Sequence, residues 1–186
     1  SLKLGCVAMS NEHFGDGKLS HRRFEHARLA ARQEIEPIRL AFRKRGWDSA
    51  VGSSGTIRAL YETLCELDPD CTAITPARLE NLIEQFIAAG HVSRLPLDSI
   101  VAERRPVIAG GLAILAEVFA ELGIKRMHVA DGAMREGVLH ELVGRFTAVD
   151  ARERTVRSMQ ARYQVDLTQA DRVEAMAVTL LRQVKS

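Results

Sequence analysis

The segment Val51-Gly-Ser-Ser-Gly-Thr56 is typical of a β-strand that ends in a turn of small residues and leads directly into a helix. The strand is predicted over residues 47–51, and the helix after the turn carries apolar side chains at helical spacing on one side. Because glycine and serine have small side chains, the backbone of such a turn stays open to close approach by another group.

The segment Val129-Ala-Asp-Gly-Ala-Met-Arg-Glu-Gly137 repeats this pattern. Its strand is predicted over residues 124–130, and Asp131-Gly132 forms the turn into a helix that runs through Val143. A further strand is predicted over residues 2–9, where apolar and other residues alternate. Strands that alternate with helices predict an α/β fold with a parallel or mixed sheet. Three short strands are fewer than the about five or six of a mean sheet, so we expect a strand pair to be missing at the N-terminus.

Helices account for most of the remaining sequence. Apolar residues three or four positions apart predict a long helix from about Ser20 to Arg45. Thr75-Pro76 is typical of a helix start and Gly90 of a helix end. Gly110-Gly111 is predicted to open another helix, which Gly123 ends.

The C-terminal part of the chain has a purely helical pattern. One helix is predicted after Asp150, and a last helix begins with the capping pattern Thr168-Gln-Ala-Asp171. We therefore expect an α/β lobe over residues 1–148 that lacks its first strands, followed by the opening helices of a second, all-α domain over residues 149–186.

The composition indicates an ordinary globular protein of 186 residues, with 46% hydrophobic and 27% charged residues. A net charge of +2 is too small to indicate nucleic acid or an anionic membrane as a partner. No apolar run approaches the roughly 18 residues of a membrane span. An odd number of cysteines, three, argues against a disulfide framework and favours a reducing, cytoplasmic location.

The two small-residue turns predict a binding site for an anion, above all phosphate. A helix N-terminus offers free N–H groups and partial positive charge, and glycine lets the backbone approach the ligand. In an open α/β sheet such turns gather at the carboxyl ends of the strands, where ligands bind. The alternative, that the glycines serve only the geometry of the connections, stays open. The predicted phosphate- or nucleotide-binding residues of the turns are Gly52, Ser53, Ser54, Gly55, Thr56, Gly132 and Arg135.

Basic residues give a further indication of anion binding. Arg104 and Arg105 lie in a segment flanked by prolines, and the planar fork of arginine matches a phosphate group. A solvated surface pair is the alternative interpretation. The helix over residues 20–46 contains eight Lys or Arg against three Glu, which would either attract a polyanion or form a solvated face.

Other chemistries are not indicated. The six histidines lack the spacing of metal ligands, and the cysteines form no C-x-x-C motif. Cys6 is either a reactive thiol or a buried strand residue. The sequence does not indicate a Ser-His-Asp triad, and no carboxylate stands out as a general base. No catalytic or metal-binding residue is therefore predicted within the chain.

Six segments occur together in a characteristic order: Ser1-Leu-Lys-Leu-Gly-Cys-Val7, Gly46-Trp47, Gly52-Ser-Ser-Gly-Thr-Ile57, Ala102-Glu-Arg-Arg-Pro106, Gly111-Leu-Ala-Ile-Leu115 and Asp131-Gly-Ala-Met-Arg-Glu-Gly-Val138. As a set they resemble the exopolyphosphatase / guanosine pentaphosphate phosphatase family, and the resemblance covers nearly the whole chain. It implies an incomplete, helix-rich ribonuclease H-like lobe of the actin-like ATPase and sugar kinase superfamily, followed by all-α helices that resemble an HD phosphohydrolase domain.

The resemblance also implies an activity. Members of the family are hydrolases that remove the terminal phosphate of inorganic polyphosphate or convert pppGpp to ppGpp in the stringent response, with magnesium as cofactor. By position, Arg104 matches an arginine that contacts the phosphate chain or guanosine polyphosphate, and Gly52 to Thr56 match a loop in the cleft. Cys6 matches a family cysteine. Glu34 stands where the family has a basic residue on the first long helix, which weakens a polyphosphate track along that helix.

The resemblance further implies that the phosphate loops and the catalytic glutamate lie upstream of Ser1. We therefore expect the 186-residue chain by itself to be inactive and the longer parent protein to be the enzyme. A non-catalytic module that senses guanosine polyphosphate and an interaction scaffold without a ligand are the alternatives. The expected partners are polyphosphate or guanosine polyphosphate and a second copy of the chain in a homodimer, without nucleic acid or membrane.

Overall fold

The computed structural model describes residues 2–95, 100–146 and 151–184. The described residues form two compact units, Ser1–Ala133 and Met134–Ser186. The predicted boundary between residues 148 and 149 and the predicted cap Asp150 lie outside the described residues.

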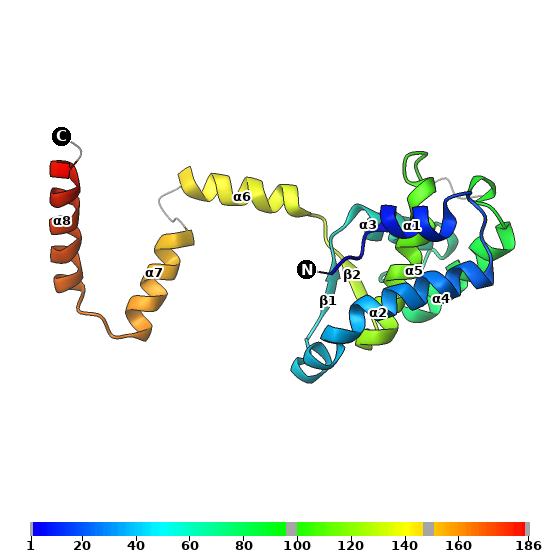
Figure 1. Cartoon of the computed structure of the whole chain (residues 1–186). Helices are drawn as coiled ribbons and strands as arrows, with labels where there is room; N and C mark the ends of the chain where they lie inside the picture. Colours follow the sequence, from blue (N-terminus) through cyan, green and yellow to red (C-terminus); the bar gives the residue numbers. More distant parts are fainter. Residues whose placement is uncertain (1, 96–99, 147–150, 185–186) are drawn as a thin grey trace. The chain divides into compact units, whose positions relative to one another are not determined.

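The first unit contains most of the structure's secondary elements (Figure 1). In chain order they are α1 (Cys6–Phe14), α2 (His21–Arg45), β1 (Ala50–Gly52), α3 (Gly55–Leu67), α4 (Pro76–Ala89), the 3-10 turn η1 (Val92–Arg94), α5 (Arg105–Leu122) and β2 (Met127–Val129). The strands β1 and β2 pair in parallel, with Ala50 opposite Met127 and Gly52 opposite Val129. The predicted α/β class is confirmed, although both strands are shorter than the predicted ranges 47–51 and 124–130.

The hydrophobic core surrounds α5. This helix packs against α1, α2, α3 and α4 (Figure 1), and most of its residues from Ile108 onward are buried. Ile108, Leu112 and Phe119 are almost completely shielded from solvent. Burying each such side chain contributes about 1.5–3 kcal/mol to folding, so α5 is the central stabilising element of the unit.

The start of α5 differs from the prediction. The helix begins at Arg105 with Pro106 in its first turn, and Gly110 and Gly111 lie in its interior. A Cβ atom on Gly110 would lie 2.6 Å from the backbone nitrogen of Ser10 in α1. The two glycines therefore allow close packing of neighbouring elements and do not open the helix.

The predicted strand over residues 2–9 is also wrong. Only residues 2–5 are non-helical, and α1 begins at Cys6 after the extended Gly5. Met9 and Phe14 bury their side chains in the core. In so short an apolar segment, alternation alone does not decide between a strand and a helix. Here the segment forms a helix that packs against α5.

The predicted helix ends are largely confirmed. The hydroxyl of Thr75 accepts a hydrogen bond from the backbone N–H of Arg78, and Pro76 is the first residue of α4. Gly90 and Gly123 follow α4 and α5 with φ of 71° and 76°, the left-handed conformation that glycine adopts without strain.

The second unit contains α6 (Met134–Phe146), α7 (Ala151–Arg162) and α8 (Leu167–Val184). The helices predicted after Asp131-Gly132, after Asp150 and near Thr168 are thus observed, although α6 was expected in the α/β lobe. The predicted cap Thr168 is wrong by two residues. Asp166 caps α8 instead, because its carboxylate accepts a hydrogen bond of 3.1 Å from the backbone N–H of Gln169. None of the helices within the described ranges has the length and apolar character required to cross a membrane.

Candidate phosphate-binding site

The two small-residue turns lie side by side. Because β1 and β2 are parallel and adjacent, both turns leave the same edge of the sheet. The backbone N–H of Ala130 donates a 2.8 Å hydrogen bond to the carbonyl oxygen of Gly52, which joins the second turn to the first. The two turns are therefore neighbours, as predicted. Ligand binding by Gly52 and Gly132 stays a prediction.

Arg58 fixes the second turn to α3. Its Nη2 atom donates hydrogen bonds to the carbonyl oxygens of Ala130 at 3.1 Å and Asp131 at 2.5 Å. Arg58 was not among the predicted site residues. A basic side chain one turn into the helix that follows the first small-residue turn is a weak signal for such a contact, because its partners are backbone atoms distant in sequence.

The N-terminus of α3 presents free donors. Ser54 is the N-cap, and its hydroxyl accepts a 3.1 Å hydrogen bond from the backbone N–H of Ile57. Within the described part of the chain no acceptor is found for the backbone N–H of Gly55 or Thr56. Such first-turn N–H groups at the positive end of a helix dipole form a ready site for an anion.

Arg104 lies beside these donors. A Cβ atom built on Gly55 would lie 2.8 Å from Cζ of Arg104 and 3.0 Å from Nη1, so the guanidinium covers the glycine directly. Arg104 is half-buried, and its guanidinium forms no ion pair with a carboxylate of the residues that the structure describes. An uncompensated guanidinium next to two free N–H groups is suited to hold a phosphate oxygen.

Thr56 and Cys6 occupy the inner side of the turn. The Oγ1 atom of Thr56 donates to Sγ of Cys6 over 3.4 Å, and the Thr56 methyl group packs against the backbone of Gly111. The side chain of Thr56 is therefore engaged with α1 and α5, and its backbone N–H is the group available to a ligand. Cys6 is a half-buried helix residue and not the predicted buried strand residue.

The remaining predicted site residues are placed differently. Ser53 is exposed in the first turn, and Gly132 belongs to the first unit. Arg135 belongs to α6 in the second unit, so a role of Arg135 in this site stays a prediction. Arg105 points elsewhere, since its side chain donates to the carbonyl oxygens of Leu95 and Ile100.

The basic character of α2 has a structural explanation. Glu117 of α5 is fully buried and accepts hydrogen bonds from Nε of Arg28 at 3.0 Å and Nε of Arg32 at 2.6 Å. These contacts raise the pKa of Arg32 above its ordinary value, chiefly through the hydrogen bond to Glu117. Arg39 pairs with Glu121 in the same way. These arginines hold α2 against α5, which leaves them poorly suited to bind a polyanion.

The described residues contain no dedicated cluster of metal ligands. No group of three or more His, Cys, Asp or Glu side chains among them could hold a metal ion. Magnesium as a cofactor stays an expectation that rests on the family resemblance.

Two family models match the chain. The model of the Ppx/GppA phosphatase family covers residues 1–146, and the model of Ppx/GppA phosphatase domain III covers residues 151–186. The chain is 42% identical over 185 residues to a guanosine-5'-triphosphate,3'-diphosphate pyrophosphatase of Aeromonas hydrophila. It is 39% identical over 183 residues to the enzyme of that name from Vibrio cholerae. These matches cover 100% and 98% of the chain but only 37% of each relative.

Solved structures share the fold. The Ppx/GppA enzyme of Aquifex aeolicus matches with a TM-score of 0.62 at 19% identity, covering 74% of this chain and 47% of its own. An exopolyphosphatase of Cytophaga hutchinsonii matches with a TM-score of 0.57 at 15% identity, covering 73% of this chain and 46% of its own. The chain thus forms a helix-rich part of the actin-like ATPase fold, with a small parallel sheet. On the sequence matches, the chain belongs to the Ppx/GppA phosphatase family.

Proposed function

We propose that this chain is part of a phosphohydrolase that removes the terminal phosphate of inorganic polyphosphate, converts pppGpp to ppGpp, or does both. The family and the names of the relatives support a hydrolase that acts on guanosine polyphosphate. The single observation that carries the site is the position of the Arg104 guanidinium over Gly55, beside the free N–H groups at the start of α3.

The groups of this chain act by binding and orienting phosphate. Phosphoryl transfer spreads charge over the oxygens of the transferring group, and fixed donors lower its energy without covalent chemistry. Arg104 supplies a charged fork and the N-terminus of α3 supplies backbone donors. Magnesium, where bound in a longer protein, would neutralise phosphate charge. The base that activates water is expected in the preceding lobe, so the 186-residue chain by itself should release no phosphate from pppGpp or polyphosphate.

Substitution of Arg104 tests this proposal in a longer protein that contains the chain. Arg104→Ala should lower kcat/KM for pppGpp by about tenfold to 150-fold, which corresponds to a charged hydrogen bond of about 1.5–3 kcal/mol. Arg104→Lys keeps the charge but loses the planar fork, so it should restore only part of the loss. Arg45→Ala, at the exposed end of α2, is the matched control. An unchanged kcat/KM in Arg104→Ala would contradict the proposal.

A non-catalytic sensor of guanosine polyphosphate is the second candidate. It is favoured by one observation: Arg104 and the first-turn N–H groups of α3, the site groups identified among the described residues, are hydrogen-bond donors. Micromolar binding of guanosine polyphosphate by calorimetry, together with a longer protein that releases no phosphate, would favour the sensor. Phosphate release by the longer protein would exclude it.

The proposed activity carries three further expectations. A pppGpp hydrolase belongs in the cytoplasm, where the stringent response operates. Magnesium is expected as its cofactor. A homodimer is supported by the small sheet, because β1 pairs only with β2 among the described strands and leaves backbone groups open to a second copy. Light scattering that shows a monomer at high concentration would argue against the dimer.

A further inference from the structure

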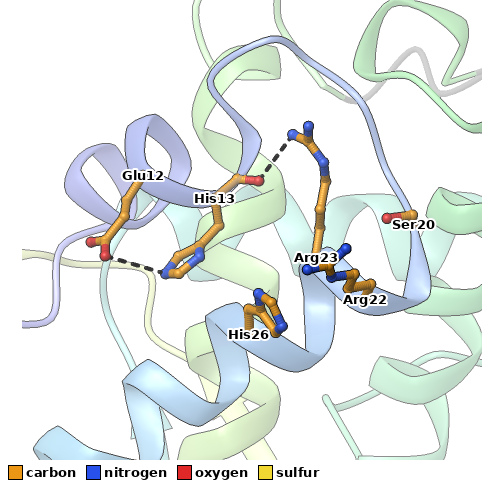
Figure 2. Close-up of a pocket in the computed structure, with 6 residues that line it drawn as sticks. All are labelled: Glu12, His13, Ser20, Arg22, Arg23 and His26. Atoms are coloured by element: carbon orange, nitrogen blue, oxygen red, sulfur yellow. Dashed lines mark hydrogen bonds and ion pairs between the residues drawn. The ribbon is translucent and has the colours of Figure 1, made fainter.

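Charged or reactive side chains also gather outside the candidate phosphate site. One such place is the pocket between the end of α1 and the start of α2, where Nη1 of Arg23 donates a 3.1 Å hydrogen bond to the carbonyl oxygen of His13 (Figure 2). This contact joins α2 to the last turn of α1. Another is a group of two thiols and a phenol near the end of α3, formed by Tyr61, Cys65 and Cys71. The candidate phosphate site makes no use of these thiols.

The side chains of Tyr61 and Cys65 both reach the same residue, Cys71. They lie four positions apart on α3, so they share one face of the helix. The Tyr61 hydroxyl and the Cys65 thiol each donate a hydrogen bond to the carbonyl oxygen of Cys71, in both cases over 3.3 Å. The connection between α3 and α4 therefore places Cys71 directly against the last turns of α3.

The two thiols also contact each other. The pKa of the Cys71 thiol lies above its ordinary value, first because burial disfavours the thiolate and second because the thiol is hydrogen-bonded to that of Cys65. The hydrogen bond between Cys65 and Tyr61 raises the pKa of the Tyr61 hydroxyl in turn. Both cysteines are free in the structure. Two sulfur atoms within hydrogen-bonding reach need only a small movement to attain the geometry of a disulfide.

Arg78 of α4 fixes the loop that carries Cys71. Its guanidinium donates hydrogen bonds to the carboxylate of Asp68 and to the carbonyl oxygens of Asp70 and Ala73. The Cys71 thiol itself donates to the carbonyl oxygen of Ala73 over 3.6 Å. The positive charge of Arg78 also favours the Cys71 thiolate, which offsets part of the rise in the pKa that burial causes. The loop is therefore held beside α3 while both cysteines are thiols.

Cys6 is too distant to join this pair. Its Sγ atom accepts the hydrogen bond from Thr56, which is the second residue of α3. Thr56 and Cys65 lie at opposite ends of that helix, about 14 Å apart along its axis. A disulfide requires Cα atoms within about 7 Å of each other. Of the three cysteines, all of them in described parts of the chain, Cys65 and Cys71 are thus the pair that can bond within one molecule.

We propose that Cys65 and Cys71 are a redox modification site, at which a low-molecular-weight disulfide converts the two thiols into an intramolecular disulfide. Cys65 reacts first, because its side chain is partly exposed whereas Cys71 is only 7% exposed. The Cys65 thiolate attacks one sulfur of the small disulfide, forms a mixed disulfide and releases one small thiol. The Cys71 thiolate then attacks the Cys65 sulfur, which releases the second small thiol.

The exchange is balanced and reversible. Two protein thiols are oxidised, one small disulfide is reduced, and the two protons of the cysteines end on the two small thiols. An excess of the small thiol drives the reaction back, so the site responds to the ratio of oxidised to reduced thiol around it. A reversible bond of this kind suits a protein in a reducing compartment, where disulfides are typically transient.

The experiment equilibrates the 186-residue chain with mixtures of oxidised and reduced glutathione, followed by alkylation and peptide mass mapping. We expect the mass of the chain to fall by two hydrogens, with a link between Cys65 and Cys71 and alkylation of Cys6. The equilibrium should favour the disulfide at least about tenfold more in the folded chain than in urea, because the fold holds the two thiols together. Three alkylated cysteines at a large excess of oxidised glutathione, a link between two chains, or a bond no more favourable than in urea would overturn the proposal.

Three variants assign the roles of the thiols. Cys6→Ser is the matched control and should form the disulfide as wild type does. Cys71→Ala should stop at the mixed disulfide, so that Cys65 carries one glutathione. Cys65→Ser, at the more exposed position, should also lose the disulfide, and its buried Cys71 should accept glutathione at least about tenfold more slowly than Cys65 does in Cys71→Ala. Equal rates in the two variants, or loss of the disulfide in Cys6→Ser, would contradict the proposed reaction.

Discussion

The guanidinium of Arg104 lies against the backbone of Gly55, so that a Cβ atom on the glycine would lie 2.8 Å from Cζ of the arginine. Arg104 is the N-cap of α5, and Gly55 is the first residue of α3. The Arg104 side chain therefore reaches from the start of α5 to the first turn of α3. The α3 dipole and the Arg104 guanidinium direct positive potential to the same place, which a phosphate group would neutralise.

Gly55→Ala should weaken phosphate binding without unfolding the protein. Gly55 does not have a left-handed backbone, so alanine fits the start of α3, and the atoms it meets belong to the flexible end of Arg104. The guanidinium must move away, and KM for pppGpp in the longer protein should rise by about threefold to tenfold. The free energy of unfolding should change by no more than about 0.5 kcal/mol.

Gly137→Ala is the matched control for Gly55→Ala, because a Cβ atom at Gly137 meets open space. Its KM should equal that of wild type. If Gly55→Ala and Gly137→Ala had the same KM, the contact between Arg104 and the first turn would have no role in binding.

Gly110→Ala should destabilise the first unit. The added Cβ would meet the backbone of Ser10 at 2.6 Å and the carbonyl oxygen of Cys6 at 2.9 Å, and neither atom can move without α1. Overpacking of this kind costs about 1–3 kcal/mol, more than alanine gains over glycine in a helix. Denaturant unfolding should show a lower midpoint for Gly110→Ala and an equal or higher one for Gly137→Ala. A stabilised Gly110→Ala would mean that α1 does not pack closely on α5.

Glu117→Gln should lower the free energy of unfolding by about 1–3 kcal/mol, because the buried charge partner of Arg28 and Arg32 is lost. Those arginines are 25% and 50% exposed and reach water, so the loss stays below that of a fully buried pair. Glu36→Gln, whose side chain is 66% exposed and pairs only at 4.0 Å, should change stability by less than about 0.5 kcal/mol. Equal effects of the two variants in denaturant titration would contradict an anchoring role of Glu117.

The pair formed by Asp68 and Arg78 should give the first unit an acid-sensitive contribution to stability. The guanidinium of Arg78 holds the pKa of the Asp68 carboxyl below its ordinary value, and the N–H of Asp70 adds to this. The folded state then binds the proton more weakly than the unfolded state. The contribution is complete above the unfolded pKa of about 3.9 and is lost as pH falls through the folded pKa.

Asp68→Asn removes this titration. The free energy of unfolding of wild type should therefore fall more steeply than that of Asp68→Asn as the pH is lowered below about 4. Above pH 5 the two curves should run parallel. Parallel curves over the whole range would show that the pair does not couple folding to protonation.

Helix ends could be predicted from the sequence, because the residues that signal them are neighbours along the chain. Thr75-Pro76, Gly90 and Gly123 mark helix ends correctly, because capping depends on a few neighbouring residues. The same rules failed at Gly110 and Gly111, where glycine is required by the approach of α1 and not by a turn. Contacts between elements distant in sequence decide such positions, and a single sequence does not display them.

In the candidate site, too, local patterns were predictable and contacts between distant segments were not. The two turns could be predicted, since a strand that ends in small residues is a local pattern, and parallel pairing then brings the turns together. The contribution of Arg58 could not, because its acceptors are the carbonyl oxygens of Ala130 and Asp131, which any residue type provides.

The most direct test is a ¹H–¹⁵N NMR titration of the 186-residue chain with tripolyphosphate. The backbone amide signals of Gly55 and Thr56 should shift progressively and saturate, and Arg104→Ala should abolish these shifts. Static signals at Gly55 and Thr56 up to saturation of the remaining shifts, or the same response in Arg104→Ala, would contradict a phosphate site at the two turns.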